Sequence, residues 1–133
     1  MKNHYLIFIL ILFIVSACDN NEPTVVDGEE SKNTETKFKL SNKIIDVGSS
    51  AGTAYISVIS NTDWTVAVNN SSNLPGLDVS PLSGKNDGTV KVKYNAVTTT
   101  YYDEQSATII FYYYSYGYRQ AETVKIRRKG KYL

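Results

Sequence analysis

Residues 107–114 read ATIIFYYY and residues 121–128 read AETVKIRR, and these two stretches decide the fold. Ile109 and Phe111 occupy alternate positions of the first stretch, and Ile126 lies in a similar alternation in the second. Apolar, β-branched and aromatic residues at every second position are typical of strands with one buried face. The sequence therefore predicts two strands whose inner faces contribute to one core.

The same alternation continues outward through residues 37–133, and no helical period persists for two turns. Clusters rich in Gly, Ser and Asn, at residues 48–52, 69–73 and 83–88, are typical of turns between short strands. The predicted strands are Lys37–Leu40, Ile44–Val47, Ala54–Ser60, Trp64–Asn69, Leu77–Ser80, Val90–Asn95, Ala107–Tyr114 and Ala121–Arg128. Their number and spacing predict an all-β fold, an immunoglobulin-like β-sandwich of about seven strands.

The predicted core must stabilise this sandwich without a disulfide between the sheets, because the chain has one Cys. Trp64 opens an alternating strand, so we expect it in the core and not on a ligand-binding surface. The residues expected to face inward are Ile56, Val58, Trp64, Val66, Val68, Val90, Val92, Ala107, Ile109, Phe111, Val124 and Ile126.

The rarest residues exclude several kinds of chemistry. His4 is the only His and Cys18 the only Cys, so a chain processed at its amino terminus keeps no imidazole and no free thiol. Ser-His and Cys-His catalysis and His- or Cys-ligated zinc are then excluded. The one adjacent carboxylate pair of the domain, Asp103 and Glu104, lies in a polar loop. We expect no catalytic residues, no enzyme activity, no cofactor and no required metal.

The amino terminus has the pattern of an export signal. Lys2 precedes an uncharged, mostly apolar run of thirteen residues from Tyr5 to Ala17, shorter than the roughly 20 residues of a transmembrane helix. Val15-Ser16-Ala17-Cys18 resembles the lipobox of bacterial lipoproteins, which implies cleavage after residue 17 and lipidation of Cys18. We therefore expect residues 1–17 to be a lipoprotein signal peptide that leaves a membrane anchor. The alternative is an ordinary secretory signal in which Cys18 is incidental.

Residues 18–36 are predicted to be a disordered, acidic tether after the lipidated Cys18. Residues 19–36 contain six acids and one Lys, a net charge of −5, and no apolar periodicity. Acidic residues after the Cys resemble the surface-export signal of Bacteroidetes lipoproteins, which implies an outer-membrane protein exposed at the cell surface. A solvated linker and, from Asp19, an inner-membrane retention signal are the alternatives. The formal charge of +1 for the chain gives no argument for a nucleic-acid partner.

Two motifs within residues 37–133 carry a family resemblance. Ser60-Asn61-Thr62-Asp63-Trp64 is followed by Val79-Ser80-Pro81-x-Ser83-Gly84 and then by Gly88-Thr89-Val90. This order resembles the BACON domain, a Bacteroidetes-associated module with an immunoglobulin-like fold and a proposed carbohydrate-binding role. The resemblance covers about residues 38–130 and implies a secreted, non-catalytic binding module.

Seven of the eleven tyrosines lie between residues 101 and 118, more than strand preference alone requires. If Ile109 and Phe111 face inward, alternation places a tyrosine row on the opposite face, with rings about 6.8 Å apart. Such a row can stack on the apolar faces of sugars, and bases on the next strand would suit an acidic polysaccharide. The predicted ligand-binding residues are Tyr112, Tyr114, Tyr116, Lys125 and Arg127.

The tyrosines and the bases each have an alternative interpretation that involves no glycan. The tyrosine row can instead contact a surface protein, which would make the chain an adaptor in an outer-membrane complex. The bases near the carboxyl terminus can equally be a charged edge that prevents aggregation between strands. These bases are Arg119, Lys125, Arg127, Arg128, Lys129 and Lys131.

Overall fold

The computed structural model describes residues 34–133, and all of its regular structure is β. Thr36–Leu133 form a compact unit. Its strands are β1 (Phe38–Leu40), β2 (Ile44–Asp46), β3 (Gly52–Ser60), β4 (Asp63–Ser72), β5 (Asp78–Ser80), β6 (Ser83–Lys85), β7 (Gly88–Tyr94), β8 (Gln105–Ser115) and β9 (Tyr118–Arg128). The predicted signal peptide, Cys18 and most of the predicted tether lie outside the described residues.

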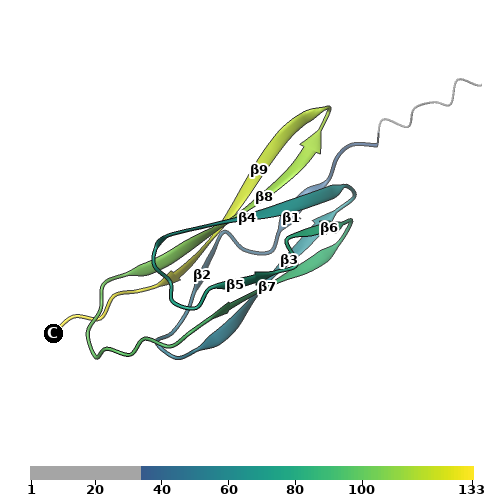
Figure 1. Ribbon diagram of the computed structural model, residues 1–133. Helices are drawn as coiled ribbons and strands as arrows, with labels where there is room; N and C mark the ends of the chain where they lie inside the picture. The colour runs from purple at the N-terminus through teal and green to yellow at the C-terminus, as the bar shows by residue number, and fades with distance from the viewer. Residues whose placement is uncertain (1–33) are drawn as a thin grey trace, which may run out of the picture. The chain divides into compact units, whose positions relative to one another are not determined.

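The strands form two sheets that face each other across the core (Figure 1). The first sheet has the order β1-β3-β7-β5, and the second has the order β2-β9-β8-β4-β6. All neighbours are antiparallel except β2 and β9, which are parallel. The chain crosses from the first sheet to the second between Ser41, which donates to the Ser57 carbonyl, and Lys43, which accepts from the Lys125 amide.

The eight predicted strands are confirmed, with ends that differ by a few residues. One strand, β6, was not predicted. Its residues were expected to be part of a turn because Ser, Gly and Lys have little preference for strands. It forms because its residues pair with the start of β4, Gly84 lying opposite Trp64. The sandwich therefore has nine strands and not about seven.

The core between the sheets contains all but one of the residues predicted to face inward. Val68 is the exception, because 40% of its surface is exposed. β6 pairs only with Asp63–Thr65, so the later part of β4 is an edge, and its register shifts between Asn69 and Ser72. Leu40, Ala54, Leu74 and Val79 complete the apolar core.

Trp64 joins the two sequence motifs in the core. The side chain is 2% exposed, and its Nε1 donates a hydrogen bond to the Asn86 carbonyl at 2.9 Å. A Cβ on Gly84 would collide with the indole ring, and a Cβ on Gly88 would lie 2.8 Å from it. The prediction that Trp64 is a core residue is confirmed, and both glycines leave room for its ring.

Within residues 34–133, no helix is long and apolar enough to span a membrane. The same residues contain no group of three or more His, Cys, Asp or Glu side chains that could hold a metal ion.

Candidate binding surface on the β8–β9 hairpin

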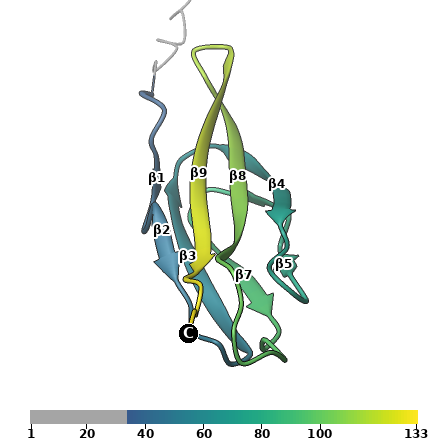
Figure 2. The same ribbon diagram turned by 90° about the vertical axis from the view of Figure 1, so that its left-hand side faces the viewer.

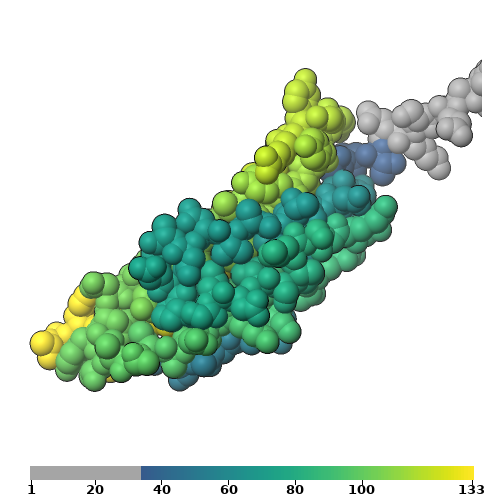
Figure 3. Space-filling view, in the orientation of Figure 1, coloured from purple at the N-terminus to yellow at the C-terminus, as the bar shows by residue number. Residues whose placement is uncertain are grey.

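β8 and β9 are the longest strands, and their hairpin projects beyond the strands beside it (Figure 2). The space-filling view shows the same hairpin protruding from the body of the domain (Figure 3). We call residues 112–121, at the end of this hairpin, the arm. Its exposed rings are those of Tyr114, Tyr116 and Tyr118, which are 62%, 66% and 73% exposed.

The structure places two of the three predicted tyrosines on one strand face. Ala107, Ile109 and Phe111 are buried, so Tyr112 and Tyr114 lie on the outer face of β8. Tyr116 does not continue this row. It occupies the turn with φ 50°, followed by Gly117 with φ 79°, because the strand ends at Ser115. Two central residues with positive φ are characteristic of the tight hairpin turn that matches strand twist.

Arg119 is a member of this surface that the sequence pattern did not predict. Its guanidinium carbon lies 3.7 Å from the centre of the Tyr112 ring. Arg119 pairs with Tyr114 across the hairpin, so Tyr112 is its diagonal neighbour on the same face. The sequence signal for this contact is the Tyr-Gly pair at residues 116–117. A two-residue turn at this pair fixes the register between β8 and β9, and so places Arg119 opposite Tyr114.

Lys125 and Arg127 lie on the predicted outer face of β9 but far from the tyrosines. They pair with Thr108 and Ser106, and Thr108 is four residues from Tyr112, about 13 Å along the strand. The structure therefore does not bring the predicted aromatic and basic residues together.

Both bases also have acidic partners. Lys125 is 3.2 Å from Glu104, and Arg127 donates two hydrogen bonds to Asp46, at 2.7 and 3.1 Å. The Arg127 hydrogen bond lowers the pKa of Asp46, and the same contact raises the pKa of Arg127. These charges are largely compensated at the surface.

A shallow groove of about 490 Å³ runs beside the arm. The residues that line it include Tyr112, Tyr114, Arg119, Thr65 and Asp63. Asp63 is itself 3.8 Å from Lys85. Ring faces beside a few hydrogen-bonding groups are typical of sites that bind an amphipathic ligand.

The base of the arm is fixed by rings on its inner side. Tyr113 stacks on Phe38 with centroids 4.1 Å apart and an interplanar angle of 12°. Phe111 contacts both Phe38 and Trp64, at centroid distances of 6.3 and 6.0 Å. Burial raises the pKa of Tyr113, with a smaller contribution from the Glu122 charge. The arm is thus an extension of the core and not an isolated loop.

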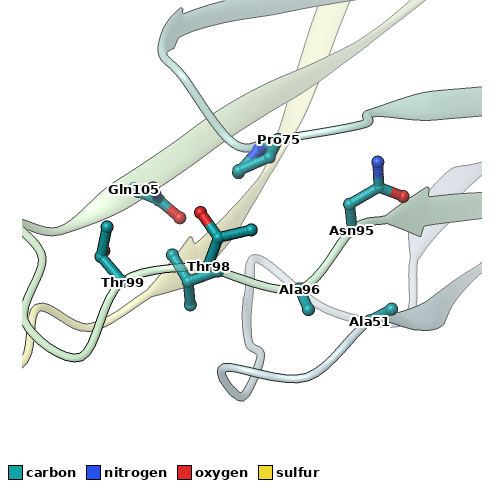
Figure 4. A pocket seen from close by; sticks show the side chains of 8 residues that line it. Ala51, Pro75, Asn95, Ala96, Thr98, Thr99 and Gln105 are labelled. Atoms are coloured by element: carbon teal, nitrogen blue, oxygen red, sulfur yellow. The ribbon is translucent and has the colours of Figure 1, made fainter.

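A second hollow, of about 650 Å³, lies at the other end of β8. Figure 4 shows it between Pro75 and Gln105 on one side and Thr98 and Ala96 on the other. Its lining consists of apolar, hydroxyl and amide side chains and carries no ionisable group.

Arg128 stabilises this end of the domain and is not part of an exposed basic edge, contrary to the sequence prediction. It is 1% exposed and donates to the carbonyls of Gly48 and Asn95, both at 2.7 Å, and to Gln105 Oε1 at 2.9 Å. Alternation places Arg128 on the inner face with Val124 and Ile126, where three oxygen acceptors compensate its burial.

No protein-family model matches the sequence, and no curated protein matches it. Solved structures match in fold. A Bacteroides ovatus GH5 xyloglucanase, solved in complex with a XXXG heptasaccharide, has 13% identity and a TM-score of 0.54. The match covers 71% of this chain and 18% of that chain.

Two chaperones also match in fold. The periplasmic chaperone SfaE has 9% identity and a TM-score of 0.55, over 73% of this chain and 59% of that chain. The E. coli chaperone DraB has 9% identity and a TM-score of 0.52, over 71% and 55%. The chain spans less than two thirds of each of these three structures. At these identities the likeness shows a shared fold of immunoglobulin type and nothing about ligands.

Proposed function

We propose that this protein is a lipoprotein of the outer membrane, exposed at the cell surface, that displays a non-catalytic binding module of the BACON type. In this proposal, residues 1–17 are removed, Cys18 carries the lipid, and the residues up to 36 are the tether. The arm is the binding surface, and its ligand is a glycan. The observation that carries the proposal is the gathering of exposed tyrosines on one projecting hairpin.

The chemistry of the arm supports a sugar ligand. Tyr112 and Tyr114 share the outer face of one strand, with their Cα atoms about 6.8 Å apart. Rings at this separation can stack on the apolar faces of successive sugar units, while their hydroxyls exchange hydrogen bonds with the sugar hydroxyls. The contact with Tyr112 orients Arg119, whose donors can reach ring oxygens, hydroxyls or a carboxylate.

The charge of the proposed ligand differs from the sequence expectation. Lys125 and Arg127 are paired with acids and lie toward the other end of the strands, so neither supports the preference for an acidic polysaccharide. Arg119 is the cation that lies over the Tyr112 ring. We therefore propose that stacking dominates recognition and that neutral glycans bind as well as acidic ones.

An adaptor function is the second candidate, and the exposure of Tyr116 and Tyr118 at the tip favours it. Tyr is enriched at protein interfaces because it contributes a large, rigid contact area and one hydrogen-bonding group. In this case the arm would contact a protein of an outer-membrane complex, and purification from membranes would recover that partner.

A glycan array probed with the full-length protein, solubilised from membranes in mild detergent, tests the proposal. Wild type is compared with a variant carrying Tyr112→Ser, Tyr114→Ser and Tyr116→Ser. Tyr55→Ser is the control, because Tyr55 is 60% exposed, close to the 62% of Tyr114, but lies on the first sheet. We expect the triple variant to lose binding while the control retains it. Equal binding by all three proteins, or by none, would argue against a glycan-binding arm.

A further inference from the structure

The outer edge of β9 is only partly covered. β2 pairs with Lys125, Ile126 and Arg127 alone, although β9 begins at Tyr118. In the part of the chain that the structure describes, no strand lies along the outer edge of residues 118–124. An uncovered edge of this length offers backbone donors and acceptors to another strand.

The hydrogen bonds to β2 identify which backbone groups face outward. The Lys125 amide donates to the Lys43 carbonyl at 2.9 Å, and the Arg127 carbonyl accepts from the Val47 amide at 2.8 Å. Outward-facing groups recur at every second residue of a strand, and β9 pairs with β8 in continuous register. The amides and carbonyls of Arg119, Ala121 and Thr123 therefore point away from β8.

The other edges of the sandwich in residues 34–133 are shorter or irregular. Beyond β1, residues 52–56 of β3 have no strand on their outer side, five residues against the seven of β9. β1, β2, β5 and β6 contain three residues each, and β4 is interrupted by its register shift between Asn69 and Ser72. Short strands and bulges are two of the ways in which proteins prevent pairing between edges. The free part of β9 has neither protection. Its charged side chains, Arg119 and Glu122, project from the two faces of the sheet and not along its edge, and Glu122 is paired with Lys43.

We infer that a second copy of this chain pairs antiparallel with β9 along this edge. The outward-pointing backbone groups of the two copies can hydrogen-bond when Arg119 of one copy lies opposite Ala121 of the other. In this register the two Gln120 residues lie opposite each other, and a two-fold axis passes between them. Moving the axis to Ala121 would bring Gly117 level with Lys125, a position that Ile44 already occupies. The Gln120 register therefore fills the free edge and clears β2. It also places no like charges opposite each other.

The pairing would join the second sheets of two copies into one continuous sheet. Tyr112 and Tyr114 of both copies would remain on its outer face, since strand addition uses backbone groups at the edge. The inference is thus independent of the glycan proposal, and either can fail without the other.

Cross-linking through Gln120→Cys in the full-length chain, expressed in cells, tests the inference. Residues at this kind of antiparallel pair have Cα atoms about 4.5 Å apart, a distance that a disulfide can bridge. We expect mild oxidation to give a species of twice the chain mass, several-fold more abundant than in the controls. The wild type controls for Cys18. Thr89→Cys controls for collision, because Thr89 is exposed on the first sheet.

A dimer fraction no higher than that of Thr89→Cys would overturn the inference, as would a cross-link to a different protein. Adding Ala121→Pro to Gln120→Cys provides a second test, because it removes one outward amide and no β8–β9 hydrogen bond. We expect this double variant to keep its far-ultraviolet circular dichroism spectrum and to lose the cross-link. A cross-link that persists in the folded double variant would contradict the proposed pairing, and if the double variant fails to fold, Gln120→Cys alone decides.

Discussion

The ring of Phe38 stacks on the ring of Tyr113, with centroids 4.1 Å apart, and so joins the first strand of one sheet to the base of the arm in the other. The two residues are far apart in sequence, and no backbone hydrogen bond links their strands. This contact fixes the direction of the arm through side chains.

Phe38→Ala should destabilise the domain by about 2–3 kcal/mol, below the ~3–5 kcal/mol typical of fully buried Phe, because Phe38 is only partly buried. Urea unfolding measures the change. Tyr114→Ala, on the exposed face of the same arm, should change stability by less than about 0.5 kcal/mol. Equal effects of the two substitutions would show that the stack does not support the arm.

Gly84→Ala should destabilise the domain by about 1–3 kcal/mol, since its Cβ would collide with the Trp64 ring. Trp64 is the only Trp, so its fluorescence reports the same displacement as a shift to longer wavelength. Gly48→Ala is the control, because no atom lies within 4 Å of a Cβ built there. An unchanged emission maximum in folded Gly84→Ala would contradict the packing described for Trp64.

The pair between Asp46 and Arg127 predicts a specific pH dependence. The hydrogen bond from Arg127 holds the pKa of Asp46 below its ordinary value of 3.8. The stability that this pair contributes is therefore present above pH 3.8 and is lost as the pH falls through the lowered pKa.

Replacing Arg127 with Gln should raise the pKa of Asp46 toward 3.8, as measured by NMR titration of the carboxyl carbon. Lys125→Gln removes the neighbouring ion pair with Glu104 and should leave the Asp46 titration nearly unchanged. If Asp46 titrates alike in wild type and Arg127→Gln, the hydrogen bond does not control its pKa.

Local alternation was sufficient to predict most of the strands and most of the core. Ile109, Phe111 and Ile126 face inward as their two-residue period requires. β6 could not be predicted in this way because residues 83–85 have no apolar pattern, and their pairing depends on the start of β4. The burial of Arg128 could not be predicted either. Arg is seldom buried without partners, and its partners here are distant in sequence.

The candidate site was predicted less completely, because it depends on contacts between distant segments. Tyr112 and Tyr114 follow from the strand period, whereas Tyr116 is displaced by the turn. The acids that pair with Lys125 and Arg127 come from residues 104 and 46, and no local pattern indicates such partners. The contact between Arg119 and Tyr112 requires the correct hairpin register.

The proposed anchor predicts a change of cellular fraction. Cys18→Ser should abolish labelling with radioactive palmitate and move the protein from the membrane fraction to a soluble or unprocessed form, because a serine hydroxyl does not replace the thioether. Fractionation and labelling are measured together, with Ser16→Ala as the control substitution before the proposed cleavage site. Palmitate labelling that persists in Cys18→Ser would refute the lipobox interpretation.

The central claim is that the arm is the surface that binds a glycan. NMR of the full-length protein in detergent micelles, with labelled tyrosine and arginine side chains, tests it when a glycan that binds on the array is added. We predict that resonances of Tyr112, Tyr114 and Arg119 shift, while those of Tyr55 and Tyr94 stay in place. Shifts confined to Tyr55 or Tyr94, with the arm unchanged, would contradict the claim.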